Sequence, residues 1–301
     1  MAKIGCPVTI VICYQKGTQG MLSICLDAIV KHTIVPYKIL LVTQENGGTE
    51  LEALSQHYSF ETFITNPSSE EEKRLLKMKP HGQMLDMALG MVDTKYLLTL
   101  DSDCFPVADG WLGKLLEMMS PDVACSGILH PWEPPPEDLP KNKIEYRVRS
   151  QLCWETTHVA CQLVEKDFLI EYDLKYVTGD DTGLDIPKYA KKIGKKVVGF
   201  MPTRCAKPSS SEFDAEFNRY VCIIWGDYVY HHGGHTRKSV FGDEKTFNES
   251  FEWVWPAIED QGADFLLKDD SSYIFSFDKE SEVSAENMQR IFGLKDQRMS
   301  G

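Results

Sequence analysis

The sequence lacks several features that mark common functional classes. Its longest apolar runs, such as residues 8–13, fall short of the ~18 residues that a membrane-spanning helix needs, so we expect no membrane span. Basic residues are in the minority, since 32 Lys and Arg stand against 45 Asp and Glu and the net charge is −13. We therefore do not expect bulk binding to nucleic acid or to an anionic membrane, because both depend on basic surfaces.

The nine cysteines include no CxxC pair, which argues against a zinc ribbon or a thioredoxin-type motif. They are odd in number and scattered singly, and we interpret them as reduced thiols in the core of a cytoplasmic protein. The motifs GxSxG, Walker A and HExxH are also missing. The usual signatures of serine hydrolases, P-loop proteins and zinc peptidases are thus absent.

The first hundred residues alternate between two kinds of apolar pattern. Continuous apolar runs at residues 8–13, 37–42 and 96–100 predict buried strands. Apolar residues recur at helical spacing over 21–30 and 82–92. This order predicts an α/β fold with a mostly parallel central sheet flanked by helices, in which ligands bind at the carboxyl ends of the strands.

The second half of the chain has a less regular pattern. Residues 181–193 predict a helix, and residues 196–200 predict a strand that follows Gly194. Short strands are expected at 221–224 and 228–231. A proline-rich loop occupies residues 131–140, and no motif is recognisable beyond residue 241.

Acidic residues follow directly after the apolar run at 96–100. Asp101, Ser102 and Asp103 form an Asp-x-Asp triplet at the expected carboxyl end of a buried strand. Two carboxylates at this spacing can reach one hard divalent cation, which often completes its shell with substrate phosphates. The position at the ligand-binding edge favours a site over a solvated turn.

Two further clusters carry groups suited to chemistry. Asp180 and Asp181 lie where a helix is expected to begin, so they are either helix caps or a catalytic base. Residues 227–238 hold histidines at 231, 232 and 235, followed by Arg237 and Lys238. This second cluster suggests a metal ligand beside a loop that binds a diphosphate.

Taken in order, these motifs resemble the GT-A glycosyltransferases, and within them the family 2 type, over roughly residues 7–240. Residues 8–15 (VTIVICYQ) are similar to the opening strand and its following tyrosine. Residues 81–86 (HGQMLD), with the strand and triplet after them, are similar to the glycine-led helix, strand and DxD motif. Residues 179–199 resemble the acidic pair, helix and strand of the catalytic base, and residues 229–234 (VYHHGG) resemble the strand with the third metal ligand.

The resemblance implies a Rossmann-like GT-A fold with an irregular acceptor side. It implies one domain over residues 1–240, with a nucleotide-sugar-binding half at 1–105 and an acceptor and catalytic half at 106–240. Residues 241–301 are expected to form a C-terminal extension that packs on the same domain.

The resemblance also implies the ligands of the site. Asp101, Asp103 and His231 would bind a divalent cation, and the mixture of carboxylates with an imidazole favours Mn²⁺ over Mg²⁺. His232 and His235 are alternatives to His231. The residues expected at the nucleotide-sugar donor are Tyr14, Gln15, Thr43, Gly82, Asp101, Ser102, Arg237 and Lys238. The family usually has an Asp at the position of Thr43, where it contacts uracil. A UDP-sugar is expected as the donor, but Thr43 leaves the identity of the nucleotide open.

The implied reaction is an inverting sugar transfer to a hydroxyl group of an unknown acceptor. Asp181, with Asp180 as the alternative, would take the proton from that hydroxyl. Arg237 and Lys238 would clamp the diphosphate, and a closing loop could carry them.

Three other hypotheses compete with this one. The chain could be a nucleotidyltransferase, which places carboxylates on a similar sheet but usually has a Gly- and Arg/Lys-rich loop after the first strand. It could be a zinc hydrolase built on Asp227, His231 and His235. It could also be a non-catalytic sugar-binding protein. His158 is expected to be a buried histidine with satisfied hydrogen bonds.

Overall fold

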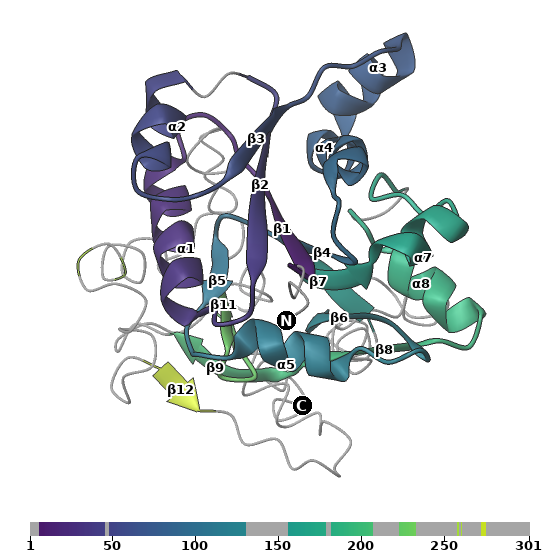
Figure 1. The fold of residues 1–301 in the computed structure, drawn as a ribbon. Coiled ribbons are helices and arrows are strands. Elements are labelled where there is room, and N and C mark those ends of the chain that lie inside the picture. Colours follow the sequence, from purple (N-terminus) through teal and green to yellow (C-terminus); the bar gives the residue numbers. More distant parts are fainter. Residues whose placement is uncertain are drawn as a thin grey trace, which may run out of the picture.

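The computed structural model describes residues 6–45, 48–130, 156–178, 182–206, 223–232, 258, 260 and 272–274. Figure 1 shows the elements, which in chain order are β1 (Val8–Cys13), α1 (Gln19–His32), β2 (Tyr37–Thr43), α2 (Gly48–Ser55), β3 (Glu61–Ile64), α3 (Glu70–Met78), α4 (Pro80–Ala88), η1 (Leu89–Met91), β4 (Tyr96–Leu100), β5 (Cys104–Pro106), α5 (Trp111–Met118), β6 (Val123–His130), β7 (Thr156–Glu165), α7 (Lys166–Glu171), α8 (Asp185–Lys192), β8 (Lys196–Phe200), β9 (Pro202–Ala206), β10 (Ile223–Trp225), β11 (Val229–His231) and β12 (Ser272–Ile274).

The central sheet has seven strands in the order β3-β2-β1-β4-β7-β6-β8. The pairs from β3 through β4 are parallel, as is β6 with β8, and only β7 runs antiparallel to its two neighbours. The expected α/β fold with a mostly parallel central sheet flanked by helices is confirmed. Because β2, β1 and β4 are parallel neighbours, their carboxyl ends lie at one edge of the sheet.

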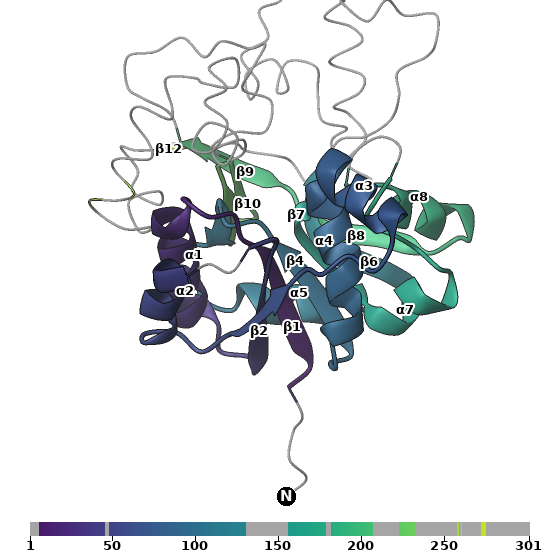
Figure 2. The same ribbon diagram turned by 90° about the horizontal axis from the view of Figure 1, so that it is seen from above.

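Helices cover both faces of this sheet, as Figure 2 shows with α1 and α2 on one side and α4, α7 and α8 on the other. Alternate side chains of β1 point to opposite faces of the sheet. Ile10 and Ile12 join the core under α1, whereas Val11 joins the core under α4. The continuous apolar run of β1 is the sequence signature of a strand that is buried on both faces.

A second, antiparallel sheet has the order β12-β9-β10-β11-β5. Three residues separate the end of β4 from the start of its strand β5, so the chain passes from one sheet to the other through residues 101–103. The turn is closed by a hydrogen bond from the Cys104 N–H to the Asp101 carbonyl at 2.9 Å. The Asp-x-Asp triplet is therefore the junction between the two sheets.

Two predicted helices have different bounds in the structure. The helix expected over 82–92 begins at Pro80, a favoured residue of the first helical turn, and gives way to the 3-10 turn η1 after Ala88. The helix expected from residue 181 begins only at Asp185, because Gly183 has a φ of 70°. Helices α3 and α5 are additional to the sequence prediction.

The remaining sequence expectations meet the structure in three places. Strand β12 pairs with β9, so residues 272–274 belong to the second sheet. The expected domain boundary at residue 240 stays a prediction. In the described ranges, no helix is long and apolar enough to cross a membrane. The six cysteines characterised there are free thiols, and Cys25, Cys104, Cys125 and Cys161 are buried.

Candidate metal and donor site

The acidic triplet occupies the carboxyl end of β4, next to the ends of β1 and β2. The β4 residues Leu97, Leu98 and Leu100 are buried, which fixes the strand in the centre of the sheet. The Asp101 N–H still donates to the Ala160 carbonyl of β7 at 3.0 Å, so the ladder continues to the first acid. Ser102 and Asp103 are buried in the turn, and Asp101 is half-buried.

His231 reaches this turn from a distant part of the sequence. Strand β11 pairs antiparallel with β5 and sets His231 opposite Cys104, one residue after the triplet. The next residue strengthens the contact, since the His232 N–H donates to the Asp103 carbonyl at 2.8 Å. The His231 Nε2 atom consequently lies 3.9 Å from the Asp103 Oδ1 atom, with both side chains only 7% and 6% exposed.

Asp101, Asp103 and His231 form a cluster with the geometry of a metal site. Each offers one ligand atom, and these atoms all lie within 4.8 Å of one another. Ligand atoms around one divalent ion at bond lengths of ~2.0–2.4 Å lie about 3–5 Å apart. The residues present therefore fit a divalent cation, and the expected trio is the one that the fold brings together.

A second histidine, His81, contacts the first carboxylate. It lies at the start of α4, and its Nε2 atom is 3.2 Å from the Asp101 Oδ1 atom. His81 was not among the residues predicted for the site. Its place at the start of a helix that precedes a buried strand was the only signal, and the partner is 20 residues away in the chain.

The charges of the site determine its protonation. Burial raises the pKa of Asp101, but the positive charge and hydrogen bond of His81 outweigh it, with help from His231 and His158, and lower the pKa to about 2. Burial lowers the pKa of His81, but the charges and hydrogen bonds of Asp101 and Cys13 together outweigh it, and the pKa lies well above 6.5.

His231 behaves in the opposite way. Burial lowers the pKa of His231 below 6.5, although the Asp101 charge acts against this shift. Its imidazole is consequently neutral at pH 7 and keeps a lone pair for a ligand, as metal coordination requires.

His158 is nearer to the site than the sequence suggested. Its ring centroid lies 5.5 Å from that of His231. Its Nδ1 atom accepts a hydrogen bond from the Ala160 N–H at 3.1 Å, in line with the expected local satisfaction. The side chain is half-buried rather than buried, so the prediction of burial was only partly correct.

Three residues expected at the nucleotide-sugar donor lie at the same sheet edge as the metal cluster. Tyr14 and Gln15 follow β1, and Thr43 is the last residue of β2. Tyr14 is only 2% exposed, and its hydroxyl donates to the Glu50 carboxylate. Thr43 is also buried, and its hydroxyl donates to the Glu45 carbonyl at 2.9 Å. Gln15 is half-buried. Their roles toward a nucleotide stay predictions.

Gly82 lies in α4, where a Cβ atom would come within 2.9 Å of the Tyr176 carbonyl oxygen. The glycine therefore allows close packing between α4 and the chain at Tyr176. Four expected site residues lie outside the described part of the chain, namely Asp180, Asp181, Arg237 and Lys238.

The zinc hypothesis required Asp227, His231 and His235 to meet. Asp227 lies in the turn before β11, where its carboxylate accepts a hydrogen bond from the Thr203 hydroxyl at 2.9 Å. Asp227 lies four residues before His231, and the cluster of possible metal ligands found among the described residues contains His231 but not Asp227. The structure does not bring Asp227 and His231 together, and His235 lies outside the described residues.

Comparison with known proteins finds no matching protein-family model and no matching curated protein. Among solved structures, a mannosyltransferase from Pyrobaculum calidifontis in complex with GDP-Man and Mn²⁺ is 12% identical at a TM-score of 0.46, over 64% of this chain and 54% of that one. S. aureus TarS is 10% identical at a TM-score of 0.44, over 78% of this chain and 62% of that one. A 4-diphosphocytidyl-2C-methyl-D-erythritol synthase from Anaerococcus prevotii is 11% identical at 0.43, over 65% and 86%.

The chain thus spans less than two thirds of the first two proteins. All three TM-scores are below 0.5, so these similarities carry no argument for an activity.

Proposed function

We propose that this chain is a metal-dependent glycosyltransferase of the GT-A type, which moves a sugar from a nucleotide-diphosphate donor to an acceptor hydroxyl with inversion. The observation that supports it most is the convergence of Asp101, Asp103 and His231 within 4.8 Å. Two sheets deliver these groups to the edge where β1, β2 and β4 end. That edge is where open α/β sheets bind their ligands.

The donor set favours one kind of cation. Two carboxylate oxygens and a neutral imidazole suit Mn²⁺, and Mg²⁺ is the second choice. Bound there, the cation would neutralise the charge that develops on the departing diphosphate. The low pKa of Asp101 keeps its carboxylate ionised and available as a ligand across the neutral range.

The chain's own residues would do the rest of the chemistry. Asp181, or its neighbour Asp180, would accept the proton of the acceptor hydroxyl. The acceptor oxygen forms its bond to the anomeric carbon on the face opposite the diphosphate, while the bond to the diphosphate oxygen breaks with its electron pair. The configuration at that carbon is thereby inverted. Arg237 and Lys238 would hold the diphosphate.

Donor recognition would depend on the neighbouring strand ends. Tyr14, Gln15 and Thr43 would lie along the nucleotide, with Ser102 in the turn between the two acids. A UDP-sugar is the first donor to test. Free buried thiols support work in a reducing compartment such as the cytoplasm.

The test is a donor screen with Mn²⁺ that measures release of the nucleotide diphosphate. We expect slow hydrolysis of one donor without acceptor, and at least a ~10²-fold loss of this rate in Asp103→Asn. Asp167→Asn is the matched control, because Asp167 is an exposed carboxylate on α7.

Undiminished turnover in Asp103→Asn, or in excess chelator, would contradict the proposal. Release of pyrophosphate from a nucleoside triphosphate, with no turnover of any nucleotide sugar, would favour the nucleotidyltransferase hypothesis instead.

A further inference from the structure

One face of α4 contacts the backbone of residues 176–178. The face is formed by Lys79, Gly82 and Asp86, which are three and four residues apart and so lie on one side of the helix. Asp86 accepts two hydrogen bonds, from the Tyr176 N–H at 2.6 Å and from the Val177 N–H at 3.0 Å. The ammonium group of Lys79, at the N-cap, donates a hydrogen bond to the Thr178 carbonyl.

Gly82 brings the helix and this backbone into direct contact. A Cβ atom at position 82 would lie 2.9 Å from the Tyr176 oxygen and 3.0 Å from the Val177 nitrogen. These neighbours are backbone atoms, so no side-chain rotation could relieve the clash. Three consecutive residues therefore touch α4 through their backbone, which fixes the path of the chain as well as its distance.

A second hydrogen bond joins Tyr176 to Gly183, which follows the acidic pair in the sequence. The Gly183 N–H donates to the Tyr176 carbonyl at 2.8 Å, and Gly183 has the positive φ of 70° that this closure needs. Tyr176 itself is fully buried. Asp180 and Asp181 are thus enclosed in sequence between two described anchor points, both of which depend on Tyr176.

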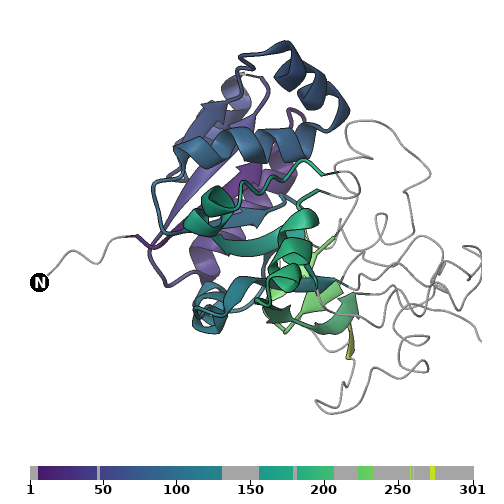
Figure 3. The ribbon, with the colours of Figure 1, turned by 90° about the vertical axis from the view of Figure 1, so that its right-hand side faces the viewer.

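Helix α4 also contacts the metal cluster, through His81. His81, one residue before Gly82, lies 3.2 Å from the Asp101 carboxylate. Figure 3 shows α4 in blue beside the green chain that leads from α7 toward α8. One rigid helix thereby contacts both the cation ligand Asp101 and the backbone that precedes the acidic pair.

Asp86 is half-buried, and backbone N–H groups hold its carboxylate. Burial raises the pKa of its carboxyl, even though two backbone N–H groups and Lys175 act to lower it. The ionised group is therefore kept at an electrostatic cost. A carboxylate accepts two N–H donors at once in fixed directions, which a neutral side chain does less well.

We propose that Asp86 is a positioning residue, which fixes the backbone of residues 176–178 against α4, the helix that also contacts the metal cluster; the acidic pair begins two residues later in the sequence. This inference depends on the proposed function, because it assigns the acidic pair the role of base. Asp86 itself touches neither substrate nor cation.

The experiment compares Asp86→Ala and Asp86→Asn with Asp167→Asn in the full chain. Asp167 is a suitable control, because it is an exposed acid on α7 that does not contribute to the pKa shift of Asp86. The first readout is hydrogen exchange of the Tyr176 and Val177 amides. We expect exchange to rise at least ~10-fold in Asp86→Ala, less in Asp86→Asn, and not in the control.

The second readout separates positioning from a general structural role. Sugar transfer should lose ~10–10²-fold in kcat in Asp86→Ala, since small misplacements of a catalytic group cost that much. The KM of the donor and the Mn²⁺-dependent rise in Tm should stay within ~2-fold of the wild type. Asp86→Asn should recover part of the kcat, because its amide oxygen can still accept one N–H.

Two different failures can be distinguished. Wild-type turnover with an unchanged kcat in Asp86→Ala would overturn the role of Asp86 alone, and so would an equal loss of kcat and of Mn²⁺ stabilisation. The absence of any nucleotide-sugar turnover by the wild type would reject the proposed function, and the role of Asp86 with it.

Discussion

Replacing Asp103 by Asn should weaken metal binding without weakening the metal-free fold. The ligand atoms of Asp101 and Asp103 lie within 4.8 Å, and two unit charges at that distance repel each other by about 3.5 kcal/mol at an effective dielectric constant near 20. The buried amide that replaces the acid costs about 1–3 kcal/mol where its hydrogen bonds are incomplete. The metal-free variant should therefore be as stable as the wild type or up to about 2 kcal/mol more stable.

The response to the cation should be opposite. At a Mn²⁺ concentration 100 times Kd, binding stabilises the wild type by about 2.7 kcal/mol, which corresponds to a rise in Tm of about 5–10 °C for a domain of this size. The variant has lost one of three protein ligands, so its rise at the same concentration should be less than about 2 °C. Scanning calorimetry with chelator and with Mn²⁺ measures both numbers.

Two results would refute this reasoning. A metal-free Asp103→Asn protein that melts well below the wild type would show that the carboxylate is needed by the fold. An undiminished Mn²⁺ response would show that the cation binds elsewhere. Asp167→Asn should match the wild type in both conditions, because its exposed carboxylate lies on α7.

Two other predictions concern the residues of α4. Gly82→Ala should lower the free energy of unfolding by up to about 2 kcal/mol in urea titrations, because the clash at 2.9 Å outweighs the ~1 kcal/mol gain in helix propensity; a more stable variant would contradict the close contact. In metal-free protein, NMR titration should give His81 a pKa above 6.5, and Asp101→Asn should lower it. The stabilisation from this ion pair is complete between pH 3.8 and 6.5, the ordinary pKa values of the two groups. It is lost as the pH rises through the pKa of His81 in the folded state, or falls through that of Asp101.

The parallel half of the fold could be predicted because each strand carries its own signal. The apolar run of β1 predicts burial on both faces, and β4 repeats that pattern immediately before the acidic triplet. The antiparallel insertion of β7 could not be predicted in the same way, since strand direction depends on pairings with β4 and β6 rather than on composition. The short strands expected at 221–224 and 228–231 are present at 223–225 and 229–231, but their antiparallel pairing in a second sheet could not be predicted.

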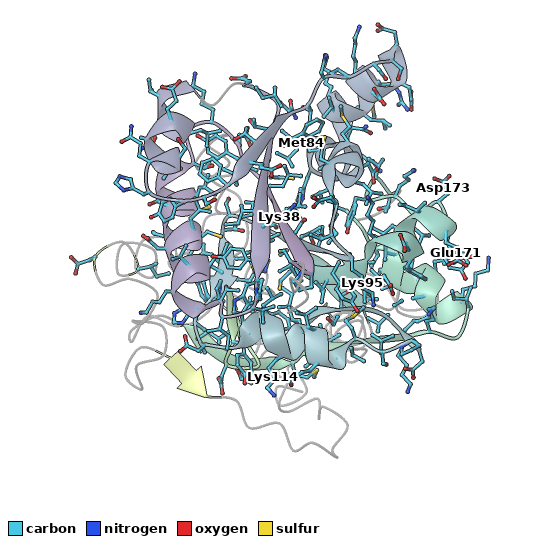
Figure 4. All side chains as sticks on the ribbon, in the orientation of Figure 1. Lys38, Met84, Lys95, Lys114, Glu171 and Asp173 are labelled. Atoms are coloured by element: carbon cyan, nitrogen blue, oxygen red, sulfur yellow. The ribbon has the colours of Figure 1, made fainter. Side chains whose placement is uncertain are left out.

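The site divides along a similar line. The triplet could be found because it lies next to its strand, and His231 because its neighbours resemble a known motif. His81 and Asp86 could not be found, because their partners lie 20 and 90 residues away and no local pattern links them. Helix α4 itself was predictable from its apolar side, on which Met84 points toward β2 (Figure 4). Its apolar side has a regular spacing, whereas its polar side has meaning only once its partners are in place.

The histidines around Asp101 also explain how an acidic cluster can be built before its cation arrives. His81, His158 and His231 come from α4, β7 and β11, and all three lower the pKa of Asp101. At pH 7, where His231 is neutral, the protonated His81 balances the charge of this carboxylate in the metal-free state. Because metal binding replaces that balance rather than creating it, removing the cation should abolish turnover while the fold persists. Inactivation by chelator without loss of the helical signal in circular dichroism would separate this arrangement from a structural metal site, whose removal unfolds the protein.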